Sequence, residues 1–208
     1  MKIKIITPYF GAFPPYFALF LRSCTINSEV EFHIFTDQSA LPPCPQNVVV
    51  HELPFSALRA LMQKKLGLRD KALRVLTPYK LCDCKPAYGV IFEDHLQDAD
   101  FWGFCDVDLI FGRIFDLLSM EELQKSERVL TQGHLTLYRN SPRMNRLFEQ
   151  PLAGGIAFRR AIEIAEPCFF DEIFMPAICR AQGVIQYGEN RFADILPQYG
   201  GFVMARLC

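Results

Sequence analysis

Asp106 and Asp108 stand one residue apart at the end of the apolar, aromatic run 101–105. That run carries no charge and is typical of a buried strand. Buried carboxylates need a partner or a hydrated strand end, because leaving them unpaired is costly. Side chains at i and i+2 of an extended segment share one face, so both aspartates can reach one cation. Their oxygens suit Mg²⁺ or Mn²⁺, which keep sites for water and phosphates. The alternative is a turn in which both carboxylates are only hydrated.

The elements that must position these aspartates alternate along the first half of the chain. A β-branched run predicts a first strand, Pro14-Pro15 precedes a predicted helix, and two further strands follow. Strand, helix and strand in this order predict a right-handed βαβ unit and a parallel sheet. Ligands gather at the carboxyl ends of such strands. The predicted strands are 2–7, 30–36 and 48–53, and the predicted helix is 16–24.

The rest of the chain predicts shorter elements around a basic segment. Between residues 59 and 85, eight Lys or Arg accompany two Asp, a local balance of +6. A solvated helical face accounts for most of these lysines, although the segment can also oppose a phosphate. Ser56 is the predicted cap of a helix that runs to about residue 65. The other predicted helices are 83–92, 120–125 and 142–149, and the other predicted strands are 128–131 and 134–138.

Composition excludes several classes of protein. The chain has 208 residues, of which half are hydrophobic, and this is typical of one folded domain. A net charge of −1 gives no reason to expect nucleic-acid binding. No uninterrupted apolar stretch is long enough for a membrane span, and the N-terminus lacks the features of a signal peptide. We therefore expect a cytoplasmic protein, with peripheral attachment to the inner face of the membrane left open and the oligomeric state undetermined. The eight cysteines are expected to be reduced, and Cys82 and Cys84 have no second pair at zinc-finger spacing.

Three segments resemble the DUF6625 family, which are bacterial glycosyltransferase-like proteins with a GT-A-type domain, often associated with polysaccharide biosynthesis. They are 6–11 (ITPYFG), 79–89 (YKLCDCKPAYG) and 102–112 (WGFCDVDLIFG), and the likeness continues through 133–140 and 170–172. The resemblance implies one GT-A-like, Rossmann-like α/β domain over residues 1–208, with a central, mostly parallel sheet flanked by helices. It also implies transfer of a sugar from a nucleoside-diphosphate sugar to a saccharide acceptor.

The resemblance implies a donor site around the aspartates. Mn²⁺ or Mg²⁺ on Asp106 and Asp108 would hold the donor's diphosphate, and Lys85 would oppose the charge that builds on the leaving group. For Asp37 the alternative is a cap of a helix or a turn. The implied donor contacts are Thr7, Pro8, Tyr9, Phe10, Asp37, Lys85, Asp106 and Val107.

The resemblance places acceptor chemistry at a second acidic pair, Asp171 and Glu172. In an inverting transferase one of them would be the general base that takes a proton from the acceptor hydroxyl. A retaining enzyme would use them differently, and the sequence leaves both open. The alternative is a structural ion pair with Arg159 or Arg160. His134 is either a packed, hydrogen-bonded residue or a catalytic group.

Three further hypotheses stay open. GT-A enzymes commonly bring a third metal ligand, often His, from their C-terminal part, but no His follows His134. Either another group completes the metal shell, or the chain is a shortened member with weak or no activity. A separate hypothesis is a non-catalytic GT-A-like remnant that binds a nucleotide or a partner without turnover. A phosphatase of the haloacid dehalogenase type also uses Asp-x-Asp with Mg²⁺. That hypothesis is disfavoured because 105 residues precede the motif and Leu109-Ile110 follows it.

Overall fold

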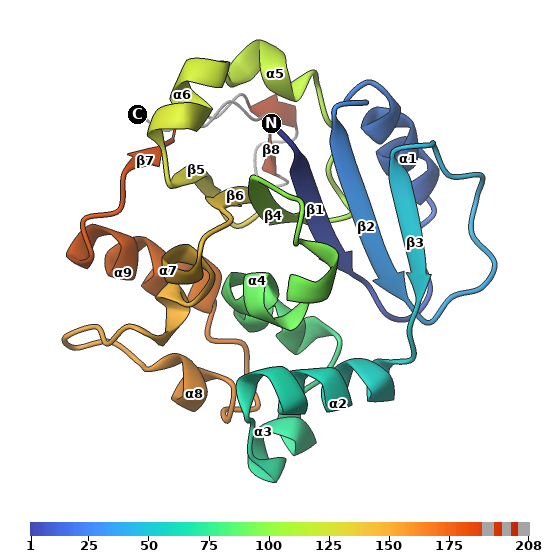
Figure 1. The fold of residues 1–208 in the computed structure, drawn as a ribbon. Helices are drawn as coiled ribbons and strands as arrows, with labels where there is room; N and C mark the ends of the chain where they lie inside the picture. Colours follow the sequence, from blue (N-terminus) through green and yellow to red (C-terminus); the bar gives the residue numbers. More distant parts are fainter. Residues whose placement is uncertain (189–193, 197–200, 204–208) are drawn as a thin grey trace.

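A seven-stranded sheet forms the centre of the computed structural model, which describes residues 1–188, 194–196 and 201–203 (Figure 1). Its strands are β1 (Ile3–Pro8), β2 (Val30–Thr36), β3 (Val48–Glu52), β4 (Phe101–Cys105), β5 (Arg128–Gln132), β6 (Leu135–Arg139) and β7 (Gln186–Tyr187). Their order is β3-β2-β1-β4-β6-β5-β7, and only β6 runs antiparallel to its neighbours. A separate antiparallel pair joins β8 (Asp194–Leu196) to β9 (Gly201–Val203). This single α/β domain with a mostly parallel sheet confirms the predicted fold class.

Helices cover both faces of the sheet, because the strands carry apolar side chains on both sides. On β1, Ile3 and Ile5 belong to one hydrophobic layer and Ile6 to the other. The first layer is covered by α1 (Phe17–Thr25), α5 (Ile114–Leu117) and α6 (Met120–Lys125). The opposite layer is covered by α2 (Phe55–Leu66), α3 (Asp70–Val75), α4 (Tyr88–Ile91), α7 (Pro142–Asn145), α8 (Phe158–Ala161) and α9 (Met175–Ala181).

Short 3-10 and π segments link several of these helices. They are the 3-10 helices η1 (Tyr79–Ala87), η2 (Glu93–His95) and η3 (Leu147–Glu149) and the π-helix η4 (Phe170–Phe174). No helix in the described ranges is long and apolar enough to cross a membrane. The seven cysteines that the structure describes are free thiols.

Most predicted elements form where the pattern placed them, and the exceptions have local causes. Each predicted strand lies within one residue of its predicted bounds. Ser56 as a helix cap is wrong, since α2 begins at Phe55 and Pro54 occupies its N-cap position. The predicted helix 142–149 divides into α7 and η3. The predicted helix 83–92 is also wrong, because it forms as η1 followed by α4. Pro86 lies inside η1 and has no N–H to continue an α-helical ladder.

The packing of α4 on β4 brings the basic segment to the sheet. Gly89 makes this possible, since a Cβ there would lie 2.5 Å from Cε2 of the Trp102 indole. The lysines at the end of this segment are consequently not solvated: Lys80 is 1% exposed and the Lys85 side chain 12%. The prediction of a solvated basic face fails for these two residues.

Candidate functional site

The candidate site lies at the carboxyl ends of β1 and β4, which are neighbouring parallel strands. The chain passes from β1 to β2 on one side, while β4 lies on the other, so the order of strands reverses here. Open α/β sheets bind ligands in the crevice at such a point. Thr7 Oγ1 lies 3.3 Å from Cys105 Sγ and joins the two strand ends. Asp106 follows β4 directly, and its N–H donates to the carbonyl oxygen of His134 at 3.0 Å.

Lys85 is the cation at the centre of this site. Its Nζ lies 2.9 Å from Asp106 Oδ1 and 3.5 Å from Asp171 Oδ2, and it donates to the carbonyl oxygen of Gly133 at 3.0 Å. Burial acts to lower the pKa of Lys85, but the two carboxylates outweigh it and hold that pKa above its ordinary value. The ammonium therefore stays charged between the two aspartates. From the sequence, Asp106 was assigned to the donor and its metal ion, and Asp171 to the acceptor.

Asp171 is a buried carboxylate with one incompletely satisfied oxygen. It is 3% exposed, and burial raises its pKa to about 6 although the Lys85 charge acts in the opposite direction. Its Oδ2 accepts no hydrogen bond from the described residues. The residue is the second of the π-helix η4, which begins at Phe170, directly after the left-handed backbone of Phe169 at φ 51°. Such irregular backbone is frequent at functional sites.

A second buried ion pair holds the backbone that precedes Asp171. Lys80 Nζ lies 2.6 Å from Asp83 Oδ2, and both side chains are almost fully buried. The Asp83 carboxylate also accepts hydrogen bonds from the N–H groups of Cys168 (2.9 Å) and Phe170 (2.8 Å). This clamp ties η1 to η4 and so places Asp171 against Lys85. Sequence reasoning missed it, because neither residue type nor spacing shows that η1 packs on a segment 85 residues away.

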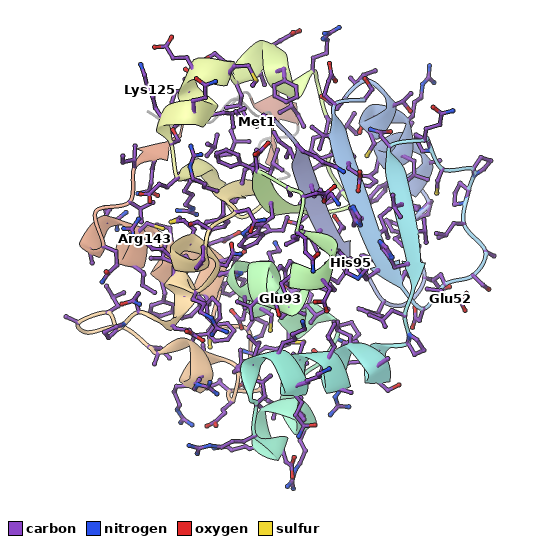
Figure 2. The ribbon with its side chains drawn as sticks, in the orientation of Figure 1. Met1, Glu52, Glu93, His95, Lys125 and Arg143 are labelled. Carbon is purple, nitrogen blue, oxygen red and sulfur yellow. The ribbon has the colours of Figure 1, made fainter. Side chains whose placement is uncertain are left out.

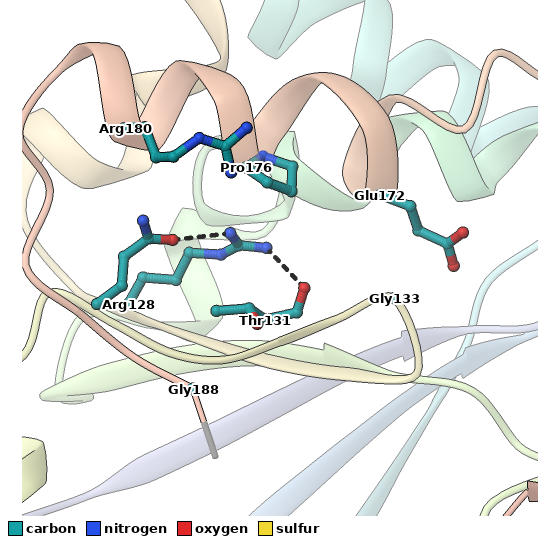
Figure 3. Close-up of a pocket in the computed structure, with 8 residues that line it drawn as sticks. Arg128, Thr131, Gly133, Glu172, Pro176, Arg180 and Gly188 are labelled. Atoms are coloured by element: carbon teal, nitrogen blue, oxygen red, sulfur yellow. Dashed lines mark hydrogen bonds between the residues drawn. The ribbon is translucent and has the colours of Figure 1, made fainter. Parts of the chain in front are cut away.

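Glu172 borders a pocket of about 390 Å³ between the β5–β6 hairpin and the helices η4 and α9 (Figure 3). Gly133 keeps this side of the pocket open, since a Cβ there would lie 2.1 Å from Glu172 Oε1. Arg128 is 1% exposed, donates to Gln186 Oε1 at 3.0 Å and lies 5.5 Å from the ring centre of Tyr138. No carboxylate among the described residues pairs with it. The lining residues are Arg128, Thr131, Gly133, Glu172, Pro176, Arg180, Gln186 and Gly188.

The aspartate motif itself is less extended than predicted. β4 ends at Cys105, and Val107 and Asp108 lie in a turn, so the shared face of an extended segment is wrong. Val107 is buried, which leaves its backbone as the part that a donor can contact, while Asp108 is exposed. No group of three His, Cys, Asp or Glu side chains converges around Asp106 and Asp108 in the described part of the chain. Their role as metal ligands stays a prediction.

The carboxylates nevertheless fit a hard divalent cation. Asp106 is 37% exposed and Asp108, two residues further on, is exposed, so these two carboxylates can offer oxygens to an ion. Carboxylate oxygens are the ligands that Mg²⁺ and Mn²⁺ prefer. The Lys85 ammonium already supplies positive charge between Asp106 and Asp171. A metal ion on Asp106 would therefore compete with the ammonium for that carboxylate, or displace the ammonium toward an anionic ligand.

The loop after β1 lies beside the end of β2, as the donor-site prediction requires. The N–H of Gly11 donates to Asp37 Oδ1 at 3.0 Å. Hydrogen bonds from Gln38 and from Gly11 hold the pKa of Asp37 below its ordinary value. The Asp37 carboxylate therefore holds the backbone of the loop after β1, and both its role as a helix or turn cap and its contact with a donor stay predictions. Phe10 is buried, whereas Tyr9 is half-buried and stacks on Phe13 at 4.6 Å between ring centres.

The arginines considered as ion-pair partners of Asp171 and Glu172 contact other residues instead. Arg159 donates to a backbone carbonyl oxygen of α2 at 2.9 Å, and Arg160 pairs with Glu163 at 3.8 Å. That alternative is wrong for Asp171, whose ion-pair partner is Lys85.

The comparisons with known proteins identify a family without assigning an activity. A model described as "Family of unknown function (DUF6625)" matches residues 5–207, which is nearly the whole chain. No match was found among curated proteins.

Proposed function

The chain belongs to the DUF6625 family, and from the geometry of its site we propose that it is a glycosyltransferase using a nucleoside-diphosphate sugar as donor. The observation that carries this proposal is the arrangement of Asp106, Lys85 and Asp171 at the strand-order reversal between β1 and β4. In this arrangement a lysine that can bind a diphosphate, Lys85, lies beside a carboxylate whose pKa is raised, Asp171.

In this proposal the donor binds between the loop after β1 and the end of β4. Thr7 to Phe10 and Asp37 would contact the nucleoside, and Lys85 and Asp106 would contact the diphosphate. Cleavage of the bond between the anomeric carbon and the diphosphate places negative charge on the leaving group. Lys85, held charged by its two carboxylates, opposes that charge where it develops.

Asp106 and Asp108 would hold the divalent cation, and Asp171, whose Oδ2 accepts no hydrogen bond from the described residues, would be the base. When bound, Mn²⁺ or Mg²⁺ supplies additional charge stabilisation to the leaving diphosphate. The loop after β1 and Lys85 would orient the donor, and Asp171 would accept the proton of the acceptor hydroxyl.

Asp171 is the better of the two candidates for the general base. In an inverting transfer, the acceptor oxygen bonds to the anomeric carbon, the bond to the diphosphate breaks, and the hydroxyl proton passes to a carboxylate oxygen. A base works best when its pKa approaches the working pH. Burial raises the pKa of Asp171 to about 6, whereas Glu172 is exposed and is better placed to bind the acceptor.

The pocket beside Glu172 is the proposed acceptor site. It begins at Gly133, whose carbonyl oxygen accepts from Lys85, so it adjoins the reacting groups. Arg128 is buried in its wall without a carboxylate partner among the described residues. Together with the exposed Arg180 it favours a saccharide that carries an acidic substituent.

Titration with nucleoside diphosphates tests the proposal. UDP, GDP and CDP are titrated by calorimetry with and without Mn²⁺, on the native chain and on the Asp106→Asn and Asp108→Asn variants. We expect one nucleotide to bind with metal-dependent affinity and each variant to bind it at least about tenfold more weakly, a change of about 1.4 kcal/mol. Asp116→Asn, at an exposed aspartate on α5, is the matched control and leaves binding unchanged. Absence of binding by any nucleotide would overturn the proposal.

Turnover separates the transferase from its two rivals. Hydrolysis of the matching nucleotide sugar, faster with an added saccharide, supports transfer. Nucleotide binding without any turnover supports the non-catalytic remnant. Release of phosphate from p-nitrophenyl phosphate that Asp106→Asn abolishes would support the phosphatase.

A further inference from the structure

Three of the four histidines of the chain gather on one face of the sheet, outside the candidate site. They are His33 on β2, His51 on β3 and His95 at the end of η2. One nitrogen of each ring lies within 4.8 Å of a nitrogen of the other two. Figure 2 shows His95 on the green segment beside the blue strands of the sheet. The cluster therefore joins the outer parallel strands to the segment that leads into β4.

The hydrogen bonds of His33 determine which of its two ring nitrogens is unprotonated. Its Nε2 lies 2.5 Å from Glu31 Oε1, so Nε2 carries the proton and donates it to the carboxylate. Its Nδ1 is then an acceptor and receives a hydrogen bond from His51 Nε2 at 2.9 Å. A carboxylate behind a histidine is the arrangement that orients imidazoles as metal ligands.

The surroundings keep the three rings close and uncharged. Phe35 stacks on His51 at 4.4 Å between ring centres and meets His95 edge-on at 5.1 Å. Burial lowers the pKa of each of these three imidazoles, that of His51 to about 4. Neutral imidazoles keep the lone pairs that a metal needs.

The charged side chains beside the histidine cluster carry no net positive charge that would repel a metal ion. Lys4 is the cation beside the cluster, and its Nζ donates to the carbonyl oxygen of His95 at 2.9 Å. That ammonium also pairs with Glu31 at 3.3 Å and with Asp98 at 2.7 Å. Lys2 also pairs with Glu31 at 3.5 Å and with Asp98 at 2.5 Å, so two positive and two negative side chains balance one another beside the three rings.

We propose that His33, His51 and His95 bind one divalent transition-metal ion, best Zn²⁺, with water as the fourth ligand. Zn²⁺ takes three imidazole nitrogens at about 2.0–2.1 Å and tetrahedral angles. The bound ion replaces the hydrogen bond between His33 and His51, whose 2.9 Å separation is already close to the spacing of two such ligands. The half-buried His51 and His95 leave one side open to water. The ion joins β2 and β3 to η2.

Cobalt substitution tests this site without any assay of activity. The full chain is stripped of metal with a chelator, and Co²⁺ or Zn²⁺ is titrated in by absorption spectroscopy and calorimetry. We expect one equivalent to bind with the visible absorption of tetrahedral Co²⁺ and no thiolate charge-transfer band, and any binding at Asp106 and Asp108 to add no tetrahedral absorption. His51→Ala and His95→Gln should each weaken binding at least tenfold, and Glu31→Gln should weaken it about 10–100-fold.

His134→Ala is the matched control, since His134 is the remaining histidine and lies outside the cluster. It should leave the Co²⁺ spectrum and affinity unchanged, as should Asp116→Asn at an exposed aspartate of α5. His95→Gln is the decisive variant, because its partly exposed side chain can change with the least risk to folding. The proposal is overturned if the native chain shows no tetrahedral spectrum, if a thiolate band accompanies binding, or if His95→Gln binds as tightly as the native chain.

Discussion

The Asp171→Asn variant should unfold less readily than the native chain at neutral pH. Burial raises the pKa of Asp171 from an ordinary value of 3.8 to about 6. At about 1.4 kcal/mol for each pKa unit, keeping this carboxylate ionised in the folded chain costs about 3 kcal/mol. The folded chain binds the proton more tightly than the unfolded chain, so this cost is absent below pH 3.8. It grows as the pH rises to about 6 and is complete above it.

Asparagine removes that cost because it does not titrate. Part of the gain is offset, since Lys85 keeps only Asp106 as its ion-pair partner. We expect a net gain of about 1–2 kcal/mol in the free energy of unfolding at neutral pH. The rate of sugar transfer should fall about 10²–10⁴-fold if Asp171 is the general base.

Urea unfolding at several pH values between about 4 and 7.5 measures the effect on stability. The difference between variant and native chain should rise by about 2 kcal/mol across this window. Asp116→Asn, at an exposed aspartate, is the control and should give a difference that does not change with pH. A flat difference for Asp171→Asn would refute the argument from burial. Full transfer activity in that variant would remove Asp171 from the role of base.

Two further substitutions test the parts that position the site. Lys80→Met leaves the fully buried Asp83 carboxylate without its ion-pair partner. It should lower the free energy of unfolding in urea by about 3–5 kcal/mol. Adding Asp83→Asn should recover part of that loss, whereas a Lys80→Met variant as stable as the native chain would contradict the clamp. Gly133→Ala places a Cβ 2.1 Å from Glu172 Oε1. The exposed glutamate side chain must turn away, so kcat/KM for the acceptor should fall at least about tenfold while the Tm changes little, and unchanged acceptor kinetics would count against the pocket.

The sheet is the part of the fold that the sequence predicts best. Strands such as 30–36 carry β-branched and aromatic residues between clear turn signals, and such local patterns depend only on neighbours in the chain. The failures lie where local preference and packing compete. Pro86 converts a predicted α-helix into η1 and α4, and Pro54 displaces the predicted cap at Ser56.

The residue types of the candidate site were visible in the sequence, but their grouping was not. Asp106 at the end of an apolar strand is a local signal, as is the acidic pair that begins at Asp171. That Lys85 would lie between these two aspartates depends on packing between segments far apart in the chain.

The parallel strands, their order along the chain and the motif Asp106-Val107-Asp108 at a strand end can be read from the residues alone, because period and composition act locally. The position of β4 beside β1, the sharing of Lys85 by Asp106 and Asp171, and the meeting of three histidines from separate elements emerge only when the chain is folded. Burial and charge pairing depend on distances in space. Those distances are set by how the helices pack on the sheet, and no spacing along the chain records them.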